Sequence, residues 1–290
     1  MEKPLRVITD SAVDMPASER EGFGIHVVPL SIQFPTGQVS SEELSPDEFY
    51  DRLRLMEPEI PTTSMPSPGY FAQLFRDVLE NGEEPLAIHI SSGLSGTINA
   101  SRQGASQVGH DITVVDTMTL SGGQRFQVLA AARAAAKGFS KQAVLDKLAE
   151  IRASTEVIYT LETLKYLQHG GRIGRVSALL ASILDIKPII KVDQADGKYS
   201  TAGKERSIRR ALDSLVTFLV HRFGPQTPLW VSVMHGQLEE QALRLVEQLG
   251  LHLAIERSEI LRISPVLGVH TGPGIVGVAA LPMALMSEFV

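Results

Sequence analysis

The feature that most constrains the fold is an alternation of short β-branched runs with longer segments of helical periodicity. The β-branched runs lie at residues 5–9, 25–34, 86–90 and 112–116. Each segment between them carries apolar residues at helical spacing and ends at a Pro, Gly or Asn signal. A strand, helix, strand order returns each strand parallel to the one before it. The pattern therefore predicts a doubly wound parallel sheet with helices on both faces.

The second half of the chain follows a less regular order. From residue 155 onward, strand runs alternate unevenly with helical segments near 206–222 and 238–249. This order predicts a second α/β region with a mixed or antiparallel sheet. The chain of 290 residues is also longer than the ~100–200 residues of a typical domain. We therefore expect two domains, residues 1–153 and 154–290.

Composition excludes several classes of function. The chain contains no cysteine, which excludes disulfides, thiolate nucleophiles and cysteine-bound metals. It has no uncharged apolar stretch of the ~20 residues that span a bilayer, and its first ten residues lack the apolar core of a secretory signal. A net charge of −6 argues against a dedicated nucleic-acid binder. We expect a cytoplasmic protein that does not insert stably into membranes.

Charge is distributed unevenly along the chain. Residues 1–155 carry 13 basic and 20 acidic side chains, whereas residues 156–290 carry 14 and 13. Within the second part, residues 165–210 hold ten basic and four acidic side chains. Such a run is either a solvated face or a docking surface for an acidic partner or an anionic ligand.

The segment at residues 88–101 is the most informative about a binding site, because a predicted strand there is followed by a Ser/Gly-rich turn and then a helix. Gly93 and Gly96 allow backbone N–H groups to converge, and the hydroxyls of Ser92 and Ser95 add donors. This pattern favours a site for a carboxylate or phosphate. The plainer interpretation is that Ser92 or Ser95 only caps the helix.

Two enzymatic motifs are incomplete in this segment. No lysine follows Gly96 as a Walker-type phosphate loop requires, and Ser95 lacks the flanking spacing of a G-x-S-x-G elbow. Ser95 would act as a nucleophile if His270 lay within hydrogen-bond reach as its base. A Ser95/His270-dependent hydrolase of small esters is therefore the alternative function.

Two further polar turns stand out. Residues 61–69 contain Thr62 and Thr63 and precede a predicted helix, so this turn should emerge at the same carboxyl edge of the sheet as the Ser/Gly-rich turn. We expect the two turns to share one ligand. The glycine-rich turn at 270–277 offers His270 beside accessible backbone, although a lone histidine is as often structural as functional.

Eight segments, in order along nearly the whole chain, resemble the motifs of the DegV family of bacterial fatty-acid-binding proteins. They are ITDSAVDMP at 8–16, PTTSMPSPG at 61–69, ISSGLSGT at 90–97, VVDTMTLSGGQ at 114–124, LETLKYLQHGGRIG at 161–174, LDIKPII at 184–190, the basic segment at 197–210 and HTGPGIVG at 270–277. The sequence departs from the family pattern at Met65, Thr117 and Leu120.

The resemblance implies a two-domain α/β carrier without catalysis of its own and without a cofactor. It implies that one long-chain, palmitate-like fatty acid lies in a tunnel between the domains. Its carboxylate would lie among hydroxyl and basic side chains, namely Thr62, Thr63, Ser92, Ser95, Arg172 and His270. Candidates for the tunnel lining are Phe71, Phe75, Leu94, Ile98, Ile158 and Leu267, although the plainer interpretation of each is an ordinary core residue.

The resemblance also implies a partner, a separate fatty-acid kinase that converts the presented acid to an acyl phosphate for phospholipid synthesis. The basic segment would then be a docking surface, with Lys204, Arg206 and Arg209 facing an acidic kinase. A third interpretation is an oligomeric scaffold whose pocket is vestigial.

Overall fold

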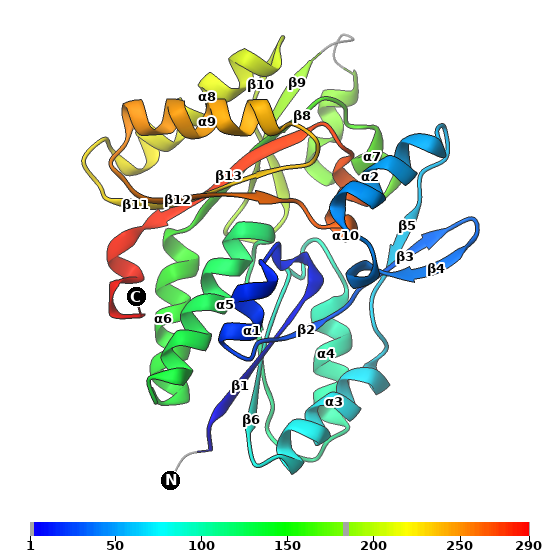
Figure 1. The fold of residues 1–290 in the computed structure, drawn as a ribbon, viewed down its shortest axis with the longest axis vertical. Helices are drawn as coiled ribbons and strands as arrows, with labels where there is room; N and C mark the ends of the chain where they lie inside the picture. Colours follow the sequence, from blue (N-terminus) through cyan, green and yellow to red (C-terminus); the bar gives the residue numbers. More distant parts are fainter. Residues whose placement is uncertain (1–2, 182–185, 290) are drawn as a thin grey trace.

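The computed structural model describes residues 3–181 and 186–289. In the motif at 184–190, Leu184 and Asp185 lie outside the described residues. The chain folds into alternating layers, in which helices cover and separate two main sheets (Figure 1).

Sheet A is the predicted parallel sheet. In spatial order its strands are β2 (His26–Val28), β1 (Leu5–Asp10), β6 (Glu84–His89) and β7 (Thr113–Asp116). All neighbouring pairs are parallel. Helices α3 (Pro68–Glu80) and α4 (Thr97–Ser106) pack on one face and α5 (Ser121–Ala136) on the other. The sheet is therefore doubly wound, as predicted.

The helices of the first half begin at recognisable caps. Ser67 precedes α3 and accepts a hydrogen bond from the Tyr70 N–H, while Pro68 occupies the first helical position. A capping box of Ser45 and Glu48 starts α2 (Pro46–Leu55). The remaining elements here are α1 (Ala17–Gly22), α6 (Lys141–Ser154) and the 3₁₀ turns η1 (Ser11–Val13) and η2 (Ser41–Glu43).

Sheet C is the mixed sheet predicted for the second half. In spatial order its strands are β10 (Tyr199–Glu205), β9 (Lys187–Val192), β8 (Glu156–Leu161), β13 (Ile275–Pro282), β11 (Leu229–His235) and β12 (Ile255–Arg262). The β11–β12 pair is parallel, and the other neighbouring pairs are antiparallel. Helices α8 (Ile208–Phe223) and α9 (Glu239–His252) cover its outer face.

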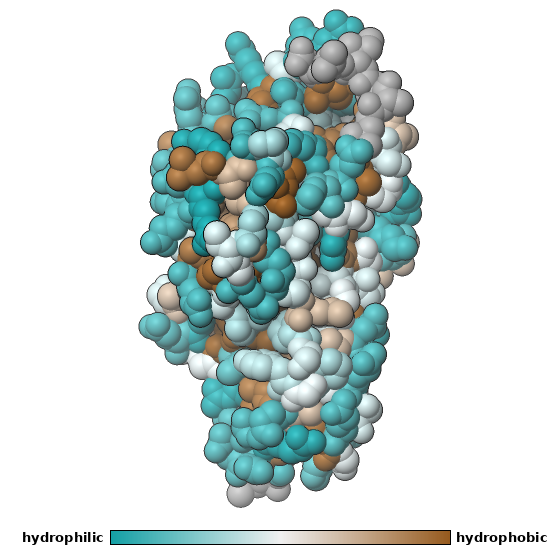
Figure 2. Space-filling view, turned by 90° about the vertical axis from the view of Figure 1, so that its right-hand side faces the viewer, coloured by the Kyte–Doolittle hydropathy of each residue, from teal (hydrophilic) through white to brown (hydrophobic). Residues whose placement is uncertain are grey.

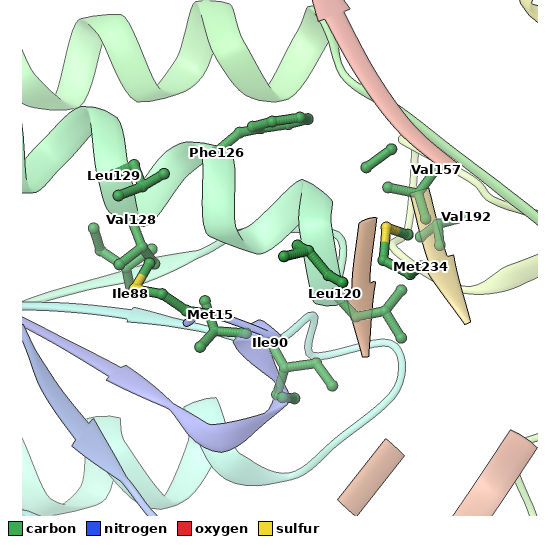
Figure 3. Close-up of a cluster of buried hydrophobic side chains, with 14 of the residues drawn as sticks. Met15, Ile88, Ile90, Leu120, Phe126, Val128, Leu129, Val157, Val192 and Met234 are labelled. Atoms are coloured by element: carbon green, nitrogen blue, oxygen red, sulfur yellow. The ribbon is translucent and has the colours of Figure 1, made fainter. Parts of the chain in front are cut away.

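Helix α5 lies between the two sheets and is almost wholly buried (Figure 1). Gly122 allows the close approach, because a Cβ there would lie 2.9 Å from the Cβ of Ala279 on β13. The resulting core extends from Ile88 of sheet A past Leu120 to Met234 of sheet C (Figure 3). One apolar cluster therefore joins both halves of the chain.

The prediction of a single strand over 25–34 is wrong. Pro29 has no N–H for a ladder and separates β2 from β3 (Ser31–Phe34). Strand β3 joins β4 (Gly37–Ser40) and β5 (Thr62–Ser64) in a small antiparallel sheet, sheet B. The predicted turn at 61–69 therefore contains a strand, which the local pattern does not reveal because its partner lies far back in the chain.

The prediction of a turn at 270–277 is also wrong in part. Residues Pro265–Thr271 form helix α10, so His270 stands in its last turn, and Gly272 ends the helix with a φ of +71°. Helix α10 packs against α2, β3 and β5 and thereby carries residues of the second half into the first. The other short elements are α7 (Lys165–His169), η3 (Gly174–Ala181), η4 (Met283–Leu285) and η5 (Ser287–Phe289).

The predicted domain boundary near residue 153 falls in the last turn of α6, after all strands of sheet A and before all strands of sheet C. Helix α5 contacts both sheets, and α10 crosses from one half to the other. The division into residues 1–153 and 154–290 stays a prediction.

Candidate ligand-binding site

An apolar slot lies between α5, α10 and sheet C. Its lining comes from both halves of the chain: Leu120, Ser121, Val157, Tyr159, Tyr199, Met234, Ile263, Leu267, Thr271, Ile275 and Gly277. The atoms that face the slot are apolar. The hydroxyls of Ser121 and Thr271 instead donate to the Asp14 carboxylate and the Leu267 carbonyl.

The slot is narrow. Its volume is about 20 Å³, far below the ~300–1,000 Å³ of a typical ligand pocket. The slot is therefore almost closed, and an acyl chain would fit only if the surrounding walls moved apart.

Beside the slot, the last turn of α10 meets strand β5. Oγ1 of Thr63 lies 2.8 Å from Nε2 of His270, and His270 is buried. Burial, together with the nearby side chains of Arg172 and His169, lowers the pKa of His270 to about 3. The imidazole is therefore neutral near pH 7, with one donor and one acceptor nitrogen.

The second ring nitrogen of His270, Nδ1, is buried and has no hydrogen-bond partner among the described residues. It faces the backbone of Gly170, where an added Cβ would lie 2.1 Å from Nδ1. Glycine is therefore required at this position. A buried polar atom without a partner is unusual and calls for a water, an ion or a ligand.

Arg172 follows Gly170 closely and is half-buried. Its Nε donates to the Leu94 carbonyl at 3.3 Å, and its Nη1 donates to the Gly170 carbonyl at 2.6 Å. Both acceptors are neutral, so neither contact neutralises the guanidinium. The contacts hold Arg172 between the segment of Ser95 and the segment that packs on His270.

Ser95 lies in the turn before α4, where its Oγ is 2.9 Å from Oγ1 of Thr97. A Cβ on the next residue, Gly96, would lie 2.8 Å from the sulfur of Met65. The turn that carries Ser95 therefore touches the segment that follows Thr63.

The structure separates each predicted hydroxyl pair. Thr62 and Ser92 are exposed, whereas Thr63 and Ser95 are half-buried. Thr62 points away from Thr63 because successive side chains of a strand alternate between faces. The backbone N–H of Ser92 is directed at the Asp116 carboxylate, 3.3 Å away.

This donor cluster, defined as Thr63, Ser95, Arg172 and His270, adjoins the slot. His270 lies next to the lining residue Thr271 on α10. Arg172 is close enough to the lining residue Tyr199 to lower its pKa, although burial raises that pKa overall, to about 12. Polar donors therefore stand beside an apolar slot.

Ser95 and His270 do not pair with each other, because Ser95 hydrogen-bonds to Thr97 and His270 hydrogen-bonds to Thr63. A Ser–His–Asp array forms elsewhere, where Nδ1 of His89 is 3.1 Å from Asp10 Oδ2 and Nε2 is 3.0 Å from Ser101 Oγ. All three residues are 0% exposed, so a substrate cannot reach the hydroxyl. The array connects sheet A to α4.

Most of the slot lining was not anticipated from sequence. Of the expected residues, Leu267 lines the slot, but Phe71 and Phe75 pack between α3 and sheet A, and Ile158 faces α8 and α9. Its neighbour Tyr159 faces the slot instead. Strand alternation predicts that difference only once the buried faces of β8 are known.

The predicted docking residues Lys204, Arg206 and Arg209 are exposed at the end of β10 and the start of α8. The sheet C register places them on the edge where β13 begins, shortly after His270. Three strand spacings, about 14 Å, separate the end of β10 from the start of β13.

The face with β3, β4 and β5 is mainly hydrophilic, with apolar residues in small patches (Figure 2).

Within residues 3–181 and 186–289, none of the helices is long and apolar enough to cross a membrane. The same ranges contain no group of three or more His, Asp or Glu side chains placed to hold a metal ion.

Comparisons with known proteins agree with the resemblance seen in the sequence. Residues 4–283 match the family described as "Uncharacterised protein, DegV family". A DegV domain-containing protein of Deinococcus radiodurans is 38% identical over 278 residues, which cover 96% of each chain.

Solved structures share the fold. A DegV family protein from Thermus thermophilus, described by its fatty acid binding, has a TM-score of 0.90 at 31% identity, covering 96% of this chain and 99% of that one. A stearic acid-binding protein from Eubacterium ventriosum has a TM-score of 0.87 at 26% identity, with 97% and 98% covered. Because the family match spans nearly the whole sequence, this chain belongs to the DegV family.

Proposed function

We propose that this protein is a carrier that binds one long-chain fatty acid. The acyl tail occupies the slot, whose walls move apart to admit it, and the carboxylate binds the donor cluster. The observation that carries the proposal is the narrow apolar slot ending beside Thr63, Ser95, Arg172 and His270. The fatty-acid-binding relatives from T. thermophilus and E. ventriosum support it.

The tail would supply most of the affinity. A saturated tail of ~15 methylenes, each contributing ~0.8 kcal/mol, gains on the order of 12 kcal/mol from burial before the entropy of binding is subtracted. The carboxylate would orient the ligand. A buried carboxylate is costly without partners, and Arg172 with two hydroxyls can provide charge-assisted hydrogen bonds.

The neutral state of His270 matters for this role. A neutral imidazole can donate from Nε2 to the Thr63 hydroxyl, which leaves the Thr63 hydroxyl proton for the ligand. This arrangement gives the carboxylate one further donor. The positive charge in the cluster then comes from Arg172.

The carrier would present the carboxylate to a separate fatty-acid kinase in the cytoplasm and would perform no chemistry of its own. The exposed side chains of Lys204, Arg206 and Arg209 support this part of the proposal, because they lie on the edge of sheet C near the donor cluster. Basic groups there would speed encounter with an acidic kinase surface.

The first test is direct ligand identification and binding. Solvent extraction of the purified protein followed by mass spectrometry should yield a long-chain fatty acid, and delipidated protein should take up one palmitate per chain. Thr63→Val should weaken palmitate binding roughly tenfold to a hundredfold, the value of a hydrogen bond to a charged group.

Thr62→Val is the matched control, because Thr62 stands on the same strand but is exposed. It should leave palmitate affinity nearly unchanged. A protein that carries no fatty acid and takes up none would contradict the proposal. Equal losses for Thr62→Val and Thr63→Val would show that β5 acts through folding instead.

A further inference from the structure

Helix α10 forms part of the slot wall and is tethered at both ends. Near its start, the backbone N–H of Ser264 donates to Oδ1 of Asp14 at 2.7 Å. At its end, His270 hydrogen-bonds to Thr63 at 2.8 Å. Between these tethers, Leu267 faces the slot. Movement of the start of α10 would therefore open the slot without first disturbing the donor cluster.

Asp14 ties this start to a second element. Its Oδ2 accepts a hydrogen bond from Ser121 at 2.5 Å, and Ser121 both begins α5 and lines the slot. Asp14 and Ser121 have left-handed φ values of +44° and +54°, a conformation that costs energy for residues other than glycine. One buried carboxylate thus holds two strained loops and α10 together.

A groove lies on the outer side of this junction. Asp14, Ser264 and Pro265 line it, and its volume is about 270 Å³. Asp14 itself is 6% exposed. If the start of α10 moved outward, the carboxylate would pass from a buried position into a water-filled groove.

We propose that Asp14 is a positioning residue for ligand retention, which holds the start of α10 over the slot and whose negative charge lowers the cost of opening. The inference rests on the proposed fatty-acid binding.

The direction of the pH effect follows from burial. Burial raises the pKa of Asp14 to about 6, although hydrogen bonds from Ser121 and Ser264 oppose the shift. In an opened, hydrated state the pKa would return to ~3.9. The closed state therefore binds a proton more tightly, so closure is favoured most below about pH 4, and this preference is lost as the pH rises through about 6. Above that pH the ionised carboxylate favours opening by at most about 100-fold, the factor that corresponds to two pKa units.

Other groups around Asp14 do not imitate this titration. Burial raises the pKa of Tyr50 and Tyr199 above the ordinary tyrosine value, and the Arg262 guanidinium keeps its charge. The Arg20–Glu42 pair also borders the groove. The pKa of His270, at the other end of α10, shifts in the opposite direction, because burial lowers it. The test therefore compares variants that all retain His270.

The experiment measures release of radiolabelled palmitate into excess unlabelled palmitate between pH 4 and 8. Asp14→Asn keeps an acceptor for Ser264, tolerates the left-handed φ and cannot ionise. The ratio of wild-type to Asp14→Asn release rates should lie within about twofold of one at pH 4, rise as the pH passes from 4 to 6, and level off above about pH 7. Glu42→Gln, which removes another carboxylate that lines the groove, is the control and should follow the wild type.

A second variant gives an independent readout. Ser121→Gly fits the positive φ and removes one donor to Asp14, so the midpoint of the pH profile should move to higher pH. A rate ratio that does not change with pH, or an unmoved midpoint in Ser121→Gly, would overturn the role of Asp14. Failure of every protein, wild type included, to retain palmitate would instead overturn the proposed function and the inference with it.

Discussion

His270 shows how a single buried residue makes the fold sensitive to acid. The folded protein keeps its imidazole neutral down to about pH 3, because the site is desolvated and Arg172 lies nearby. In the unfolded chain the same group binds a proton near pH 6.5. Its contribution to stability is therefore complete above pH 6.5 and is lost as the pH falls toward 3.

Replacing His270 by Gln should reduce this pH dependence. The wild-type free energy of unfolding should fall by about 3 kcal/mol from this residue between pH 6.5 and 4, and His270→Gln should remove most of that slope. Urea unfolding of ligand-free protein at several pH values measures it. Identical slopes for both proteins would mean that His270 becomes protonated in the folded state.

At the scale of elements, α5 determines how closely the two sheets approach. Its first turn has glycine where a side chain would enter sheet C, since a Cβ at Gly122 would also lie 2.9 Å from the sulfur of Met234. Met234 lines the slot. The spacing between α5 and sheet C therefore sets both the packing of the core and the width of the slot.

Gly122→Ala should destabilise the protein by about 1–3 kcal/mol through overpacking and should weaken palmitate binding. Gly250→Ala is a matched control on α9, where an added Cβ meets nothing within 4 Å. It should stabilise the protein by about 0.5–1 kcal/mol because alanine favours the helix. Thermal unfolding measures the stability of both variants. Similar changes in Tm for Gly122→Ala and Gly250→Ala would refute the packing argument.

At the scale of the whole molecule, a buried arginine joins the two halves. The side chain of Arg125 on α5 is 1% exposed. Its guanidinium donates to Glu19 of α1 at 2.5 Å and to Glu259 of β12 at 2.6 Å. Removal of one partner of a buried ion pair leaves an uncompensated charge. This network holds sheet C against the first half, so that the slot keeps both of its walls and the basic edge keeps its place beside the donor cluster.

Charge reversal tests that basic edge. The double change Arg206→Glu and Arg209→Glu should slow kinase-dependent acyl-phosphate formation, more strongly at low salt, without changing palmitate affinity. Reversal of exposed Arg102 and Arg244 alters the net charge equally on other surfaces and should have little effect. Loss of palmitate affinity along with activity would assign Arg206 and Arg209 to the fold or the pocket.

Sequence patterns predicted the two sheets, most helices and the segments that form the donor cluster. They misplaced β3, β5 and α10, because the pairing of Thr63 with Ile32 and the contact of α10 with sheet B are long-range. They also left Thr62 and Thr63 equivalent. Only a strand assignment gives the two threonines opposite faces.

The sequence by itself determined the α/β class and the family, because hydrophobic periodicity and short motifs depend only on the order of neighbouring residues. Only the tertiary structure decided which side chains line the slot, that His270 meets Thr63, and that Asp14 joins α5 to α10. These features depend on contacts between residues distant along the chain, whose geometry is set by the packing of two sheets around one helix.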